Sequence, residues 1–177
     1  LGEQTNMETS LKTAVNNTGS LTASQKKLFN KLASENPKLV VATADHTVNT
    51  TITLANHESL YFDVKAGRKY VVEAELLTLA NGTDGIKVAF NTTTDATAAR
   101  IRWTYSVTAA ADTAEFQTDI TSPSPTGRNA AVTGIRGNGV ILAGADGRIT
   151  LQSALHTDNN AASVIYKFSY IKIYEFE

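Results

Sequence analysis

The C-terminal stretch Val164–Phe176 reads VIYKFSYIKIYEF, and its alternation decides the fold class of the chain. Side chains of an extended chain point alternately to its two faces. One face of this stretch carries the apolar and aromatic residues Val164, Tyr166, Phe168, Tyr170, Tyr174 and Phe176. The other face is also mostly apolar and carries Ile165, Ser169, Ile171 and Ile173.

A strand that is apolar on both faces needs two burial partners, because one apolar face would otherwise remain in water. We therefore expect one face to close a β-sandwich and the other to meet a neighbouring subunit or the continuation of the same sandwich. The residues that we assign to this interface or core strand are Tyr166, Phe168, Tyr170, Ile171, Ile173, Tyr174 and Phe176.

Helical periodicity upstream of Lys38 predicts that residues 1–37 form a helical arm of two short amphipathic helices. A turn-prone segment, Asn16–Gly19, ends the first helix, and Asn36-Pro37 ends the second. Helices this short are marginal alone, so they should dock on the parent domain, on symmetry-related copies or on another protein. The apolar docking residues of the arm are Met7, Leu11, Val15, Leu21, Leu28 and Leu32.

Residues 38–177 change to a period of two and are rich in threonine, which favours a pleated sheet. We predict strands at 39–43, 48–54, 60–64, 70–76, 86–90, 101–107, 116–120, 132–143 and 149–155, followed by the terminal strand. Turn signals separate them, among them Lys65–Arg68 and Ala145–Gly147. Nine or ten strands without a helical interruption predict a mainly β protein, an antiparallel sandwich or barrel, and a jelly-roll-like β-sandwich fits best.

Composition narrows the possible roles. The 177 residues suffice for one domain and an arm, and a net charge of -1 with scattered Lys and Arg gives no nucleic-acid footprint. The chain has no cysteine, which excludes disulfides and suits a reducing cytosol. No apolar run is long enough for a membrane span and the polar start is no signal peptide. Because the chain begins at Leu1, we expect processing or a longer product.

No motif predicts catalysis, a metal or a cofactor. His46, His57 and His156 lack metal-ligand spacing, so we expect solvated surface histidines. Glu73 and Glu75 are about 7 Å apart on one strand face, a spacing that suits a glycosidase but also an ordinary solvent-facing strand. The segment Gly134–Gly139 lacks the helix that a phosphate loop needs, so its glycines should permit a bulge or a close strand approach.

Polar loops and aromatic residues leave two weaker possibilities. The oxygen-rich segments Asn81–Gly85 and Asp158–Asn160 lack the spacing of a calcium loop, and we expect turns there. Trp103, Tyr61 and Tyr105 would form a sugar-stacking platform if they were exposed, although a lone tryptophan on an alternating strand is usually in the core.

Two segments resemble structural proteins of tailed bacteriophages. Glu58–Leu77 combines an alternating strand, an Ala-Gly turn and a tyrosine three residues after the glycine. Gly139–Leu155 is a strand, a glycine turn and a strand containing LQSA, followed by a polar loop and the last strand. The resemblance spans about residues 39–177. It implies a jelly-roll or tumour-necrosis-factor-like sandwich in a virion module, often trimeric, that serves as a capsid decoration or cement protein or as a fibre head.

We therefore expect a non-enzymatic structural virion protein, assembled in the host cytoplasm. In the favoured hypothesis it is a homotrimeric capsid decoration or cement protein whose arm docks on a capsid or tail protein. The alternative is a tail-fibre, receptor-binding or carbohydrate-binding β-sandwich module, the one case in which a glycan is a partner. A polysaccharide-degrading enzyme using Glu73 and Glu75 is the third hypothesis.

Overall fold

The computed structural model describes residues 37–48, 51–80, 85–92, 96–107, 111–118, 120, 126–128, 131–157 and 162–176. The helical arm and its docking residues Met7, Leu11, Val15, Leu21, Leu28 and Leu32 lie outside the described residues, so the arm stays a prediction.

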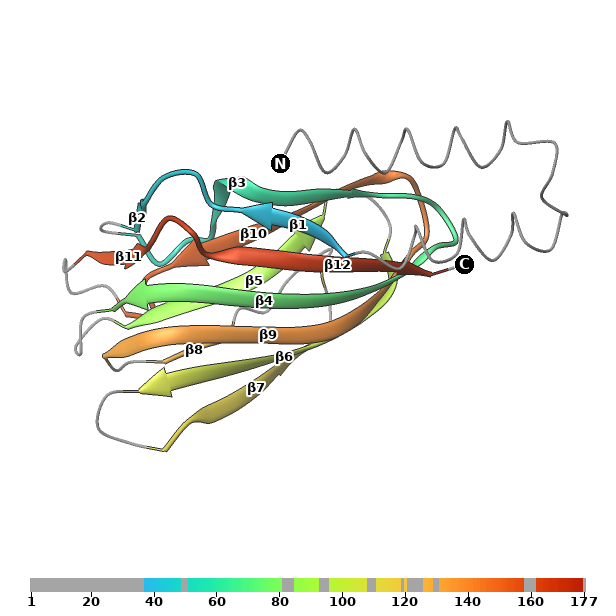
Figure 1. Cartoon of the computed structure of the whole chain (residues 1–177). Helices are drawn as coiled ribbons and strands as arrows, with labels where there is room; N and C mark the ends of the chain where they lie inside the picture. The colour runs from blue at the N-terminus through green and yellow to red at the C-terminus, as the bar shows by residue number, and fades with distance from the viewer. Residues whose placement is uncertain are drawn as a thin grey trace, which may run out of the picture. The chain divides into compact units, whose positions relative to one another are not determined.

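The described residues form antiparallel sheets, which confirms the mainly β prediction. The strands are β1 (Lys38–Val41), β2 (His46–Val48), β3 (Ala55–Val64), β4 (Lys69–Leu79), β5 (Ile86–Thr92), β6 (Ala96–Val107), β7 (Thr113–Gln117), β8 (Thr126–Arg128), β9 (Val132–Ala143), β10 (Gly147–Ala154), β11 (Ser163–Ile165) and β12 (Tyr170–Phe176). The larger sheet has the order β1-β12-β4-β9-β6-β7, with β11 beside β4 and β2 beside β11. The smaller sheet has the order β3-β10-β5-β8. Figure 1 shows β12, β4, β9 and β6 side by side in the larger sheet.

The core lies between the two sheets. Even positions of β4, the odd positions 101, 103 and 105 of β6 and the odd positions 135, 137, 141 and 143 of β9 are buried, as the alternation requires when one face of a sheet is covered. Aromatic rings join the sheets: Phe62 of the smaller sheet contacts Tyr70, and Phe90 contacts Trp103 with ring centroids 5.2 Å apart. These contacts place both sheets in one hydrophobic cluster, so the sandwich is held by side chains from two layers.

Most strand predictions are confirmed, and the predicted strand over 132–143 coincides with β9. The turn at Lys65–Arg68 also forms: Gly67 has a φ of 73°, a conformation that glycine adopts without steric cost, and the Arg68 N–H donates to the Lys65 carbonyl. The predicted strand over 48–54 is wrong. There β2 ends at Val48, and Ile52 is 50% exposed instead of facing the core.

The terminal stretch is two strands rather than one. In the larger sheet β12 pairs with β1 and β4, whereas β11 pairs with β2 and the far end of β4. The four residues between them include Phe168, whose φ of 71° interrupts the extended chain. The buried side chains nevertheless stay on one side, so the alternation does not reveal the break.

Candidate functional site

The odd positions of the terminal stretch form its core face. Ile165 and Ile171 have no exposed surface, Ile173 is buried, and Ser169 is buried between them. Ile171 pairs with Ala74 and Ile173 with Val72, both of which also face the core. The isoleucines, and not the aromatic residues, therefore close the sandwich.

The even positions face away from the smaller sheet. Phe168 is 67% exposed and Phe176 is 49% exposed, while Tyr166 is exposed and Tyr170 and Tyr174 are half-buried. We call the side of the larger sheet that Tyr170 shares with its neighbours the outer face. By register, its residues include Leu39, Val41, Tyr170, Lys172, Tyr174, Phe176, Lys69, Val71, Glu73, Glu75, Leu77, Arg136, Asn138, Val140, Arg100, Arg102, Thr104 and Phe116.

Apolar side chains gather at one end of the outer face. Tyr174 on β12 pairs with Val71, and Val71 pairs with Val140 on β9, which is half exposed. Phe176 lies one pair further along β12. Apolar groups in adjacent positions on three neighbouring strands form a continuous patch rather than isolated exposed residues.

Charged side chains, with a basic excess, occupy the middle of the outer face, and the exposed Leu77 and Leu79 lie at the other end of β4. The five cationic residues are Lys69, Arg100, Arg102, Arg136 and Lys172. The carboxylates on the described strands of this face are Glu73 and Glu75, and Asp112 lies at its edge, within reach of the Ser106 hydroxyl. Because the whole chain has a net charge of -1, the outer face is more positive than the remaining sequence.

Glu73 and Glu75 lie on the outer face of β4, as the solvent-facing interpretation predicts. The Arg136 guanidinium donates to Glu75 Oε1 at 3.0 Å and to Oε2 at 3.2 Å, which occupies both carboxylate oxygens. Glu73 pairs by register with Lys172 and Asn138. The two carboxylates therefore lie among cations on the outer face.

Trp103 is completely buried and so cannot stack a sugar. Its ring lies over Gly137 on the neighbouring strand, where an added Cβ would come within 2.5 Å of it. A Cβ at Gly139 would lie 2.4 Å from the Arg100 carbonyl oxygen, so two glycines of the 134–139 segment serve close strand approach as predicted. Tyr61 is exposed, but the Arg148 guanidinium covers its ring at 4.0 Å.

The break between β11 and β12 is held by polar contacts. The Ser169 hydroxyl accepts the Leu77 N–H at 3.0 Å and donates to the Tyr166 carbonyl at 2.7 Å, which satisfies backbone groups where β4 changes partner. The Lys167 N–H donates to Asp45 Oδ1 at 2.8 Å. The exposed Phe168 is thus anchored, through its neighbour, to the segment that joins β1 to β2.

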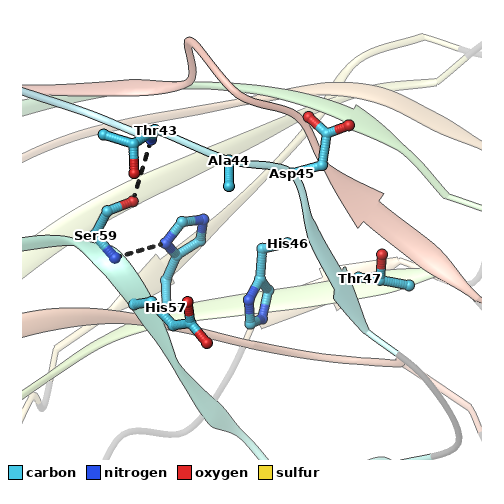
Figure 2. Close-up of a pocket in the computed structure, with 8 residues that line it drawn as sticks. Thr43, Ala44, Asp45, His46, Thr47, His57 and Ser59 are labelled. Carbon is cyan, nitrogen blue, oxygen red and sulfur yellow. Dashed lines mark hydrogen bonds between the residues drawn. The ribbon is translucent and has the colours of Figure 1, made fainter.

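That segment forms a small pocket with the beginning of β3, which we call the histidine pocket. Its volume is about 270 Å³, and it is lined by Thr43, Ala44, Asp45, His46, Thr47, His57, Glu58 and Ser59. Figure 2 shows Thr43, Ala44 and Asp45 along one side of the His57 ring and His46 beside it. The two imidazole rings have centroids 4.7 Å apart.

His57 corrects the prediction that all three histidines are solvated, because only 3% of it is exposed and His46 is half-buried. His57 Nδ1 accepts the N–H groups of Ser59 and Leu60, each at 3.3 Å. The ring proton must therefore be on Nε2, and this buried N–H has no hydrogen-bond partner. Burial, and then the neighbouring His46, lower the pKa of His57 to about 4. Burial also lowers the pKa of His46, against the opposing effect of Glu58.

No described residues form a cluster of three or more His, Cys, Asp or Glu side chains suited to a metal ion. The part of the chain that the structure describes also contains no helix long and apolar enough to cross a membrane. His156, the third histidine, is exposed as predicted. No sequence pattern indicates the histidine pocket, since His46 and His57 are eleven positions apart and belong to no motif.

Comparisons with known proteins give no family. No family model matches the chain, and no curated protein does. Among solved structures, a chain in the structure of infectious bursal disease virus Gx strain matches with 11% sequence identity and a TM-score of 0.19. The match covers 79% of this chain and 40% of that chain. The VP2 subviral particle of infectious bursal disease virus is 8% identical with a TM-score of 0.20, over 77% of this chain and 40% of that one. This chain thus spans 40% of the length of either match, and scores of 0.19 and 0.20 are too low to carry an argument.

Proposed function

We propose that the chain is a structural, non-enzymatic virion protein whose sandwich associates as a homotrimer and decorates a capsid. The observation that carries the proposal is the outer face, where Tyr174, Val71 and Val140 form an apolar patch on a sheet whose opposite side is already the core. Such a patch, rimmed by charged residues, is typical of a protein-protein interface.

The charge of the outer face favours a ring over a face-to-face dimer. A twofold dimer would place the five cations of one copy against the same five cations of the other. In a trimer, the outer face of one copy meets a different surface of the next copy. The sequence outside the outer face carries the compensating negative charge, which suits this heterologous contact.

The strand order supports a virion role by analogy of fold. We interpret β1-β12-β4-β9 facing β3-β10-β5-β8 as the two four-stranded sheets of a jelly roll, with β6 and β7 as an insertion between β5 and β8. Jelly rolls with eight strands occur in viral capsid and lectin domains, and this is an argument from architecture alone. The N-terminal arm would then dock the trimer on a capsid or tail partner.

Two matched double variants test the proposal. Ile171→Ser with Ile173→Ser removes two core side chains and should unfold the protomer, whereas Tyr170→Ser with Tyr174→Ser should leave a folded monomer. Native mass spectrometry of the full chain at micromolar concentration should find a wild-type trimer, and circular dichroism should report folding. A stable wild-type monomer would argue against self-association. Imaging an assembled particle and finding this chain on the capsid surface tests the virion role.

A further inference from the structure

We propose that a bulge in β3 is an acid switch, in which protonation of His57 opens the bulge and releases segment 42–48 together with the turn that carries Phe168. The side chain of His57 holds the bulge closed, and the segment in turn holds the turn in place. Each of these contacts lies within one chain, so the switch does not require the proposed trimer.

The bulge forms where β3 has more residues than its partner strand β10. Tyr61 pairs with Thr150 and Asn56 pairs with Gln152, so residues 57–60 lie opposite a single residue of β10. A bulge interrupts the ladder of backbone hydrogen bonds between two strands. Its buried N–H groups therefore need an acceptor other than the neighbouring strand.

His57 supplies that acceptor. Its Nδ1 accepts the N–H groups of Ser59 and Leu60, each at 3.3 Å, and Figure 2 shows the bond from Ser59. An imidazolium ion has a proton on both nitrogens and can accept no hydrogen bond. Protonation of the buried His57 would place a third donor against these two N–H groups, so the bulge must open for the ring to take up the proton.

The charged groups that line the histidine pocket do not stabilise an imidazolium ion in the closed bulge. The rings of His46 and His57 have centroids 4.7 Å apart, so they repel each other when both are charged. The carboxylates of Asp45, before β2, and of Glu58, on β3, attract a cation. Burial, and then His46, nevertheless lower the pKa of His57 to about 4, so these carboxylates do not offset the cost of burying the charge.

Segment 42–48 is held in place by the closed bulge. The Thr43 N–H donates to the Ser59 hydroxyl at 3.4 Å, as Figure 2 shows. His46, in β2, lies against the His57 ring. In the part of the chain that the structure describes, β2 is three residues long and pairs with β11 alone. Short elements at the edge of a sheet open at a lower free energy than central strands, so the segment should open while the rest of the sandwich stays folded.

The same segment holds the turn of residues 166–169 between β11 and β12. The Phe168 N–H donates to the Ala42 carbonyl at 3.0 Å, and the Lys167 N–H donates to Asp45 Oδ1 at 2.8 Å. These contacts keep Phe168 at a φ of 71°, which is unfavourable for an aromatic residue. Release of the segment should therefore relax the turn and move the exposed Phe168 ring.

Amide hydrogen exchange of the full chain, followed by NMR at pH 7 and pH 5 and corrected for the chemical exchange rate, tests the switch. An open form in which His57 has its ordinary pKa of 6.5 gains on the order of 20-fold in population over a closed form with a pKa of about 4. The protection of the Ser59, Lys167 and Phe168 amides should fall by that factor. Unchanged protection of Ser59, or a turn that does not follow it, would overturn the proposal.

Urea distinguishes opening of the segment from unfolding of the whole domain. Unfolding exposes a large surface and becomes steeply more favourable as urea is added, whereas opening of a short segment does not. At low urea, exchange of the Ser59 and Lys167 amides should not respond to urea, while exchange of the Val72 amide in the central strand β4 should accelerate. The same urea dependence at all three amides would show that the segment opens only with the domain, which contradicts the switch.

His57→Asn is the matched variant, because the asparagine oxygen can accept the same N–H groups but does not titrate. The protection of the Lys167 amide should then change by less than about fivefold between pH 7 and pH 5, a remainder that belongs to His46, whose pKa burial also lowers. A change of about 20-fold in the folded variant would assign the opening to another group and overturn the role of His57. If His57→Asn does not fold, His57→Gln gives the same test, and the wild-type measurements need no variant.

Discussion

Gly137 lies beneath the ring of Trp103 and leaves no room for a Cβ. A Cβ there would lie 2.5 Å from one ring carbon and 2.9 Å from another, and the ring is fully buried. Overpacking of this kind costs about 1–3 kcal/mol. We therefore expect Gly137→Ala to lower the free energy of unfolding by about 2 kcal/mol, measured by urea denaturation followed by Trp103 fluorescence.

Gly134 provides the matched control on the same strand. A Cβ there meets only the Leu76 carbonyl oxygen, at 3.7 Å, which is ordinary van der Waals contact. Gly134→Ala should therefore change the stability by less than about 0.5 kcal/mol. Equal losses of unfolding free energy in both variants would show that alanine is unfavourable in this strand for a backbone reason and not because of contact with the Trp103 ring.

His57 should make the protein less stable in acid. Its pKa is about 4 in the folded chain and 6.5 in an unfolded one, so between these values the unfolded chain binds the extra proton. The stabilisation of the folded state that comes from neutral His57 is fully present above pH 6.5 and is lost as the pH falls toward 4. We expect a loss on the order of 2–3 kcal/mol between pH 7 and pH 4, measured by urea denaturation at several pH values.

His57→Asn is the control for this pH dependence. The asparagine oxygen can accept the Ser59 and Leu60 N–H groups but does not titrate, so the variant should lose most of the slope between pH 4 and 6.5. The smaller slope that remains belongs to His46, whose pKa burial also lowers while Glu58 opposes the shift. A wild-type slope in His57→Asn would assign the acid sensitivity to other groups.

At the scale of elements, Gln117 ties β7 of the larger sheet to β5 of the smaller one. β8 pairs with β5 only from Ile86 to Val88, which leaves the backbone of Phe90 beyond its end. The Gln117 amide fills that place: its Oε1 accepts the Phe90 N–H at 3.0 Å and the Trp103 Nε1–H at 3.1 Å, and its Nε2 donates to the Phe90 carbonyl at 2.6 Å.

Gln117→Leu should therefore cost about 2–4 kcal/mol, because it leaves three buried polar groups without these partners. Gln152→Leu is the control, since Gln152 makes an exposed contact with Asn56 at 2.8 Å and should cost less than about 1 kcal/mol. Thermal unfolding of the two variants gives the comparison. Similar midpoints would mean that water replaces the Gln117 contacts.

Phe168 interrupts the chain between β11 and β12 because its φ is 71°. This left-handed conformation is unfavourable for an aromatic residue and costs conformational free energy. Because its ring is mostly exposed, Phe168→Gly should stabilise the protomer by about 0.5–1 kcal/mol, as measured by chemical denaturation. Retention of the strained residue is explained if the ring contacts a partner, so the same variant should weaken self-association. A variant that is less stable as a protomer would show that the ring supports the fold instead.

The elements differ in how far the sequence determines them. β9 is predicted in full because most of its residues alternate between core and solvent, although the alternation shifts between the buried Val132 and Ile135. The residues of the predicted strand over 48–54 alternate as well, yet Ile52 is exposed. An alternating sequence indicates which side chains would share a face, but not whether a partner strand is available to pair with the segment. β8 was missed because three residues between loops have too little periodicity to detect.

At the scale of the whole molecule, the sequence predicted two faces for the terminal stretch but not which face is the core. Isoleucines and tyrosines are both compatible with burial, and the choice depends on β4, whose small and aliphatic residues Val72 and Ala74 accept the isoleucines. The histidine pocket was beyond prediction for a related reason. It is formed by the segment before β2, by β2 itself and by β3, and their proximity depends on the packing of the sheets.

Assembly should also appear in the thermal stability of the intact protein. If folded copies bind one another and unfolded chains do not, the melting temperature rises with protein concentration, by mass action. We expect an increase of a few degrees between about 1 and 100 μM in scanning calorimetry, and a smaller one in about 1 M salt, because screening weakens contacts of the basic outer face. The Tyr170→Ser, Tyr174→Ser variant should melt at one temperature throughout. A wild-type melting temperature that does not depend on concentration would mean that the outer face binds a different protein and not another copy of this chain. Contacts of that protein with residues 1–37 would then be tested next.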